Sequence, residues 1–107
     1  YGKFPLMLTV NCPIKNSTGC GKCRHSVTDR TGRSFSVHCT EGYTEIFNSD
    51  TVYLADKPEA LKATDFITLW FTDENEKDIL RIINDYTNGT DSAPDKITRG
   101  LYFRGIK

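Results

Sequence analysis

The chain has 107 residues, of which 37% are hydrophobic, and its 14 basic residues balance 14 acidic ones. A chain of this length makes one domain or part of one, and its modest apolar content leaves little surplus stability without a covalent or metal staple. The balanced charge argues against a general polyanion-binding role, and no apolar run reaches the roughly 20 residues of a membrane-spanning helix.

The chain is predicted to open with a strand that leads into a cysteine-rich loop. Residues 4–10 are apolar and β-branched, and this composition predicts a buried strand. Residues 11–24 are rich in Asn, Gly, Lys and Cys and hold almost no apolar side chains. Because hydrophobic burial cannot fix such a loop, we expect another force to hold it.

A hairpin and two more strands are predicted after this loop. Residues 26–37 have strand character around the turn 29–32, where a glycine supplies the positive φ angle. Residues 43–47 and 51–54 are predicted to form two separate strands, because the turn-forming residues 48–50 lie between them.

The second half of the chain is predicted to contain two helices with a strand between them. A short helix is expected over residues 56–62, and residues 65–71 are the most β-like stretch of the chain. A longer helix over residues 74–87 has Asp73 as its expected N-cap and Glu76 as the partner in a capping box. Its expected apolar face consists of Ile79, Leu80, Ile82, Ile83 and Tyr86.

These elements together predict a mixed α and β fold. It starts with a cysteine loop, a β-hairpin and short strands, and continues with a strand–helix unit that resembles the end of a β/α barrel. We expect residues 1–107 to be a single domain or an excised fragment. Within it, residues 11–40 are the expected Cys-rich, metal-binding loop and hairpin, and residues 41–107 the mixed strand and helix part.

The four cysteines are the strongest functional signal, and they are predicted to be the ligands of one metal centre. Two intervening residues between the middle pair let both sulfurs face one ion, and four thiolates suit tetrahedral zinc or a [4Fe–4S] cluster equally well. His25 and His38 lie beside the cysteines and could replace one of them as a ligand. The predicted metal ligands are Cys12, Cys20, Cys23 and Cys39.

Three alternative states of the cysteines remain open. Two disulfides would suit a secreted module, because the count is even and Asn16 and Asn88 begin triplets of the glycosylation pattern. The cysteines could also be free core residues. In the third alternative Cys20 and Cys23 form a redox-active pair, although no thioredoxin-like context surrounds them.

The end of the chain interleaves cations with aromatic side chains. Arg99, Tyr102, Phe103 and Arg104 have the composition of surfaces that bind single-stranded nucleic acid. An ordinary strand whose arginines extend toward solvent has the same composition. RNA contact is therefore an alternative function of this tail.

Several blocks of the sequence resemble the later part of the collagenase-like peptidases, family U-32. They occur in the family's order and cover essentially the whole chain. The blocks are Tyr1-Gly2-Lys3-Phe4-Pro5-Leu6-Met7, Cys12-Pro13, Asp29-Arg30-x-Gly32, Tyr43-x-Glu45-Ile46-x-Asn48-Ser49, Phe71-Thr72-x-Glu74 and Thr98-Arg99-Gly100-x-Tyr102-x-Arg104-Gly105.

The resemblance implies a cytoplasmic bacterial or archaeal protein, with most of a β/α-barrel-like catalytic domain in a preceding N-terminal part. That part would be the partner of this chain, and the substrate would be a protein or an RNA. Members are known as peptidases, and several relatives act in RNA base or ubiquinone hydroxylation, some with a four-cysteine [4Fe–4S] cluster. No catalytic group is identifiable in this chain, and no membrane partner is expected.

Overall fold

The computed structural model describes residues 1–104, so Gly105 of the last matching block lies outside the described residues. The chain divides into two compact units. The first, here called the cysteine unit, is Phe4–Ser49, and the second, the helical unit, consists of Tyr1–Lys3 and the chain from Asp50 onward. The fold is mixed α and β, as the sequence predicts.

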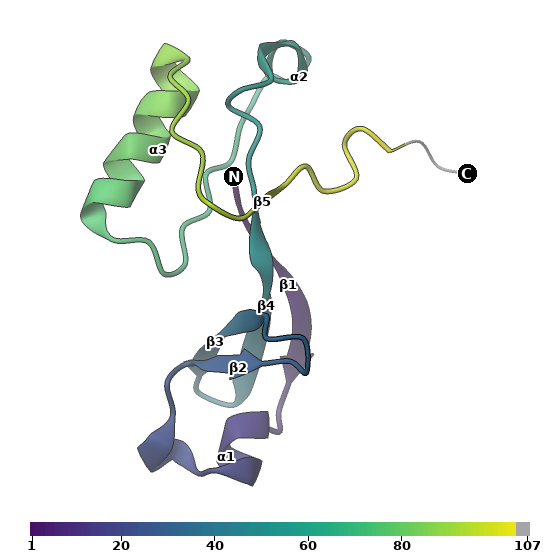
Figure 1. The fold of residues 1–107 in the computed structure, drawn as a ribbon, viewed down its shortest axis with the longest axis vertical. Helices are drawn as coiled ribbons and strands as arrows, with labels where there is room; N and C mark the ends of the chain where they lie inside the picture. Colours follow the sequence, from purple (N-terminus) through teal and green to yellow (C-terminus); the bar gives the residue numbers. More distant parts are fainter. Residues whose placement is uncertain (105–107) are drawn as a thin grey trace. The chain divides into compact units, whose positions relative to one another are not determined.

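Five strands are paired with one another in the described part of the chain (Figure 1). The order of four of them is β1 (Gly2–Thr9), β4 (Tyr43–Val52), β3 (Ser34–Thr40) and β2 (Ser26–Thr28). The β2–β3 and β3–β4 pairs are antiparallel. In the helical unit, the end of β4 pairs in parallel with the short strand β5 (Ile97–Thr98).

The predicted hairpin is confirmed as the β2–β3 pair. Its turn is held by Asp29, whose Oδ1 accepts hydrogen bonds from the backbone amides of Thr31 at 2.8 Å and Arg33 at 3.0 Å. Gly32 has a φ of 85°, which a residue with a Cβ adopts only with strain. The pKa of Asp29 is lowered, first because the Thr31 hydroxyl donates to its carboxylate.

The prediction of two strands on either side of residues 48–50 is wrong, because β4 runs through these residues without a break. Residues of β4 that precede this stretch pair with β3, and Thr51 and Val52 pair with β5. Both flanks are thus fixed in ladders, and this pairing outweighs the turn preference of Asn, Ser and Asp.

The first predicted strand is confirmed as β1, but the prediction that it is buried is wrong. Phe4, Leu6, Met7 and Leu8 are all more than half exposed, and Leu8 reaches 67%. β1 is at one end of the strand order, so that β4 is its neighbour in the sheet. Apolar composition predicts that a strand forms, but its burial requires another element packed against it. Within residues 1–104, these apolar side chains of β1 remain exposed.

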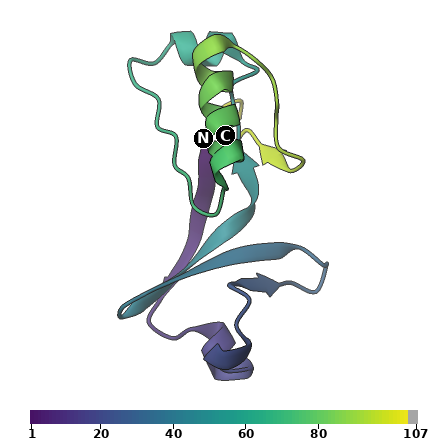
Figure 2. The ribbon, with the colours of Figure 1, turned by 90° about the vertical axis from the view of Figure 1, so that its left-hand side faces the viewer.

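Three helices and a 3-10 turn complete the described fold. They are α1 (Pro13–Ser17), the turn η1 (Cys20–Lys22), α2 (Pro58–Lys62) and α3 (Glu76–Asn88). α1 and η1 are consecutive and lie next to each other in the cysteine unit (Figures 1 and 2). In the helical unit, the chain from α3 to β5 runs back along the helix in both views.

The longer helix is confirmed, but the cap at Asp73 is wrong. The N-cap is Asn75, whose Oδ1 accepts from the amide of Asp78 at 2.9 Å. Glu74 lies before the helix, and its carboxylate accepts from the amide of Thr72 at 2.7 Å, so Glu74 stabilises the turn that precedes α3. The helix ends at Gly89 in the left-handed conformation.

The predicted strand over residues 65–71 does not form, so the strand–helix unit lacks its strand. Two backbone hydrogen bonds join this segment to Tyr1. The Tyr1 amino group donates to the Thr68 carbonyl at 3.0 Å, and the Trp70 amide donates to the Tyr1 carbonyl at 2.9 Å. Phe66 is 92% exposed. High β-propensity needs a neighbouring strand to be realised, and within residues 1–104 the two hydrogen bonds to Tyr1 are not continued as a ladder.

The core of the helical unit is small and aromatic. Its buried members are Tyr53, Ala55 and Ile82, and partly buried hydrophobic residues pack around them. The buried face of α3 is narrower than predicted, because Leu80 and Ile83 are exposed. Among residues 1–104, no helix has the length and apolar character needed to span a membrane.

Candidate metal centre

The first predicted ligand, Cys12, ends the loop that follows β1 and is the N-cap residue of α1. Its side chain is half-buried. The pKa of the Cys12 thiol is lowered, chiefly because the backbone amide of Lys15 stabilises the thiolate. The amide of Ile14, the hydroxyl of Thr44 and the thiol of Cys39 act in the same direction, whereas partial burial opposes them.

Cys39 lies on β3 directly opposite Thr44 of β4. The Thr44 hydroxyl donates to Cys39 Sγ at 3.9 Å, and Thr44 is only 5% exposed. Because both thiols interact with the same buried hydroxyl and with each other, the structure brings Cys12 and Cys39 together. These two residues are distant in the sequence; the β3–β4 ladder places Cys39 opposite Thr44, and the Thr44 hydroxyl also interacts with Cys12.

Cys20 and Cys23 enclose the turn η1. The Cys23 amide donates to the Cys20 carbonyl at 3.1 Å, so a backbone hydrogen bond closes the turn. The backbone amide of His25 donates to Cys23 Sγ at 3.3 Å. The second pair of thiols is thus also fixed locally, with a backbone N–H directed at one sulfur.

All four cysteines are free thiols, and all lie in the cysteine unit. Within residues 1–104, no three side chains of His, Cys, Asp or Glu are gathered as a metal-binding group. The structure therefore brings together Cys12 with Cys39 and holds Cys20 with Cys23 in one turn. A single centre that uses all four remains a prediction from the sequence.

The donor set fits a zinc ion or a [4Fe–4S] cluster. Both are bound by thiolates, and hydrogen bonds to sulfur favour the charged form that binds metal. Such bonds reach three of the four sulfurs, from backbone amides at Cys12 and Cys23 and from the Thr44 hydroxyl at Cys39. Of the two histidines considered as alternative ligands, His38 lies on β3 with its side chain exposed, and its Nδ1 is 4.0 Å from Glu45 Oε2.

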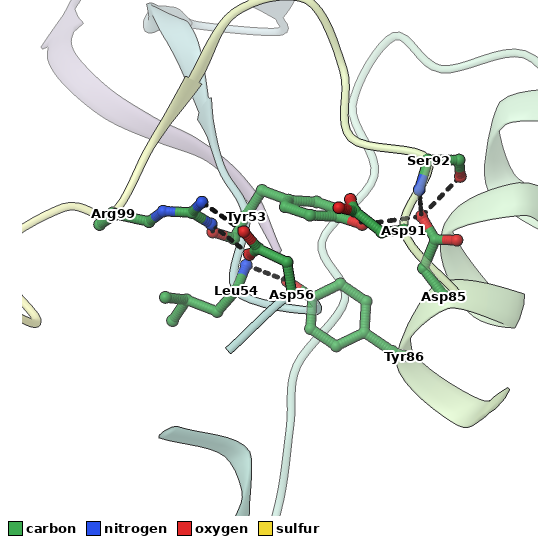
Figure 3. A network of polar contacts seen from close by, with 8 residues as sticks. All are labelled: Tyr53, Leu54, Asp56, Asp85, Tyr86, Asp91, Ser92 and Arg99. Atoms are coloured by element: carbon green, nitrogen blue, oxygen red, sulfur yellow. Dashed lines mark hydrogen bonds and ion pairs between the residues drawn. The ribbon is translucent and has the colours of Figure 1, made fainter. Parts of the chain in front are cut away.

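A buried polar network in the helical unit has no counterpart in the sequence predictions (Figure 3). Asp85 on α3 is 1% exposed. Its carboxylate accepts from the Tyr53 hydroxyl at 3.0 Å, from the Ser92 hydroxyl and amide at 2.6 and 3.2 Å, and from the Thr90 hydroxyl at 2.6 Å. Burial acts to raise the pKa of Asp85, but the hydrogen bonds from Ser92, Thr90 and Tyr53 outweigh it and hold that pKa below its usual range.

Arg99 lies at the other side of Tyr53 in the same view (Figure 3). Its guanidinium binds both carboxylate oxygens of Asp56, at 2.5 and 2.6 Å, and also donates to the Tyr53 carbonyl. The pKa of Asp56 is lowered, first because Arg99 donates to it. Arg99 thus stabilises the fold of the helical unit, while a role of the tail in RNA contact stays a prediction.

One signal in the sequence could have revealed this network. Asp85 occurs three residues after Ile82 and one before Tyr86, on the stripe of α3 that faces the core. A carboxylate at such a position is buried only when several donors satisfy it. The loop after α3 supplies them from Thr90 and Ser92.

Comparisons with known proteins return no relative of this chain. No family model, no curated protein and no solved structure matches it. The resemblance to the collagenase-like peptidases therefore rests on the sequence blocks alone.

Proposed function

We propose that the cysteine unit binds one metal centre through Cys12, Cys20, Cys23 and Cys39. The centre is a zinc ion or a [4Fe–4S] cluster, since four thiolates serve either. A zinc ion here is structural and staples the loop over residues 11–24, in which Ile14 is the buried apolar side chain, whereas a cluster also carries electrons.

The observation that carries this proposal is the hydrogen bonding of the sulfurs. Cys23 Sγ accepts the His25 amide, and Cys39 Sγ accepts the Thr44 hydroxyl. A neutral thiol is a weak acceptor and has little use for such donors, whereas a thiolate that binds metal is stabilised by them. Half-buried or exposed thiols with donors directed at them suit metal ligands better than core residues.

We further propose that the chain is a cytoplasmic member of family U-32 and contributes this centre to a larger peptidase-type enzyme that acts on a protein or an RNA. The partner of the chain in this proposal is a β/α-barrel-like N-terminal part. Support comes from residues 66–71, which belong to no strand in the described part of the chain and expose Phe66 and Trp70. Such a segment is suited to receive a neighbouring strand.

Metal analysis of the purified chain tests the proposal, with protein prepared both in air and without oxygen. We expect one zinc ion, or four irons with brown absorbance, per chain. Replacement of Cys20 by Ser should remove the metal and destabilise the cysteine unit together. The matched control is Thr40→Ser, a conservative change beside Cys39 that leaves all four thiols in place. Full metal content and unchanged stability in Cys20→Ser would refute the proposal.

A further inference from the structure

His25 has an unusual backbone conformation. It is the one residue other than glycine with a positive φ angle in the described part of the chain, at 52°. This left-handed region is sparsely populated by residues with a Cβ, and such strain is retained where the surrounding structure uses it. His25 lies between the turn that holds Cys23 and the first residue of β2.

The hydrogen bonds of His25 show what this conformation does. The register of β2 on β3 places Ser26 opposite Ser36, so that His25 would be opposite Val37 in a continued ladder. A hydrogen-bonded antiparallel pair exchanges two bonds between its members. Here the Val37 amide donates to the His25 carbonyl at 2.8 Å, but the His25 amide turns away and donates to Cys23 Sγ at 3.3 Å.

From this geometry we infer that His25 is a positioning residue of the metal centre, whose left-handed backbone takes its N–H from the sheet and directs it at the Cys23 sulfur. The imidazole is not a ligand. This inference rests on the proposed function. Its consequence is that the backbone at residue 25 matters for metal affinity, while the identity of its side chain matters only through the conformation that it permits.

Two substitutions separate the backbone from the imidazole. His25→Gly removes the ring and adopts a positive φ without penalty, so we expect its metal affinity to stay within about threefold of the parent. His25→Val carries a β-branched side chain that disfavours this region, and loss of a contact that supports a ligand costs metal affinity roughly 10-fold or more. Arg24→Val is the matched control, because it adds the same side chain one position earlier.

The affinities are measured by competition with a zinc chelator, and the contact itself by NMR of protein loaded with ¹¹³Cd. In the loaded parent we expect scalar coupling between the metal and the His25 amide proton, which is transmitted through the N–H···S bond. The coupling should persist in His25→Gly. It provides the answer even if His25→Val fails to fold.

Each outcome decides one of the two ideas. An absent coupling to the His25 amide, or equal losses of affinity in His25→Gly and His25→Val, would overturn the inference, and so would a His25→Val protein with parental affinity. The proposed function fails separately, if Cys23→Ser binds metal as the parent does. When Cys23→Ser loses the metal and the His25 variants behave as expected, both stand.

Discussion

Replacement of Asp85 by Ala should destabilise the helical unit by about 2 kcal/mol. The Tyr53 hydroxyl loses its 3.0 Å bond to Asp85 and keeps only the longer 3.3 Å bond to Asp91, which costs about 1 kcal/mol. Thr90 and Ser92 lie nearer the surface, so water replaces the lost acceptor there and the added cost is about 1 kcal/mol.

The pH dependence of this effect has a definite sign. The pKa of Asp85 is lowered in the folded chain, so its contribution is fully present above the ordinary carboxyl pKa of about 4 and is lost as pH falls through the lowered value. Asp85→Asn cannot titrate at this position. The stability difference between parent and Asp85→Asn should therefore be constant near neutral pH and shrink below about pH 4.

Urea unfolding followed by tryptophan fluorescence measures both effects, because the single tryptophan, Trp70, lies in the helical unit. Asp91→Asn is the matched control. Asp91 is exposed and accepts from the Tyr53 hydroxyl at 3.3 Å, so this change should cost no more than about 0.5 kcal/mol. A cost below about 1 kcal/mol for Asp85→Ala would show that the Asp85 hydrogen bonds contribute little to stability, and a difference between the parent and Asp85→Asn that does not change from about pH 7 to 3 would show that Asp85 is not the titrating group.

Three further changes test other contacts. Asn75→Ala removes the N-cap of α3 and should lower the free energy of unfolding by about 1 kcal/mol in the same urea assay. Thr44→Val removes the hydroxyl that donates to Cys39 and should weaken metal binding about 10-fold in chelator competition, with the strand pairing kept. Arg99→Ala leaves Asp56 without its partner and should destabilise the helical unit by about 2 kcal/mol, a loss that Arg99→Lys reverses only in part.

Each of these expectations has a clear contradiction. If Asn75→Ala left the free energy of unfolding unchanged, Asn75 would not be the cap of α3. Thr44→Ser keeps a hydroxyl and should bind metal like the parent, so equal losses in both Thr44 variants would argue for packing and not for the hydrogen bond. Full stability of Arg99→Ala would show that the ion pair is only a surface contact.

Local patterns in the sequence predict the elements that local interactions build. The turn at Asp29 and Gly32 forms as expected, because an Asp side chain and a glycine with positive φ fix it without distant partners. The end of α3 at Gly89 is predicted for the same reason. The start of α3 is not predicted, because Asp73 and Asn75 are both good caps; in the structure Asn75 caps the helix, and Asp73 binds Lys3 at 2.8 Å.

Local sequence patterns do not predict features that depend on residues far away in the chain. Residues 48–50 carry turn-forming side chains and still extend, because ladders hold β4 on both flanks. Residues 65–71 have the highest β-propensity and remain irregular, because within residues 1–104 their hydrogen bonds to Tyr1 are not continued by a paired strand. Cys12 and Cys39 likewise meet at Thr44, the ladder partner of Cys39, and no spacing of cysteines reveals this contact.

Elemental analysis of the anaerobically purified chain shows whether Cys12, Cys20, Cys23 and Cys39 bind one metal centre. We expect one zinc ion or four irons per chain, and loss of that metal in each of the four Cys→Ser variants but not in Thr40→Ser. A parent chain without metal that also fails to take up zinc or a reconstituted cluster would contradict it. So would a native mass lower by four hydrogen atoms, which marks two disulfides in place of the metal.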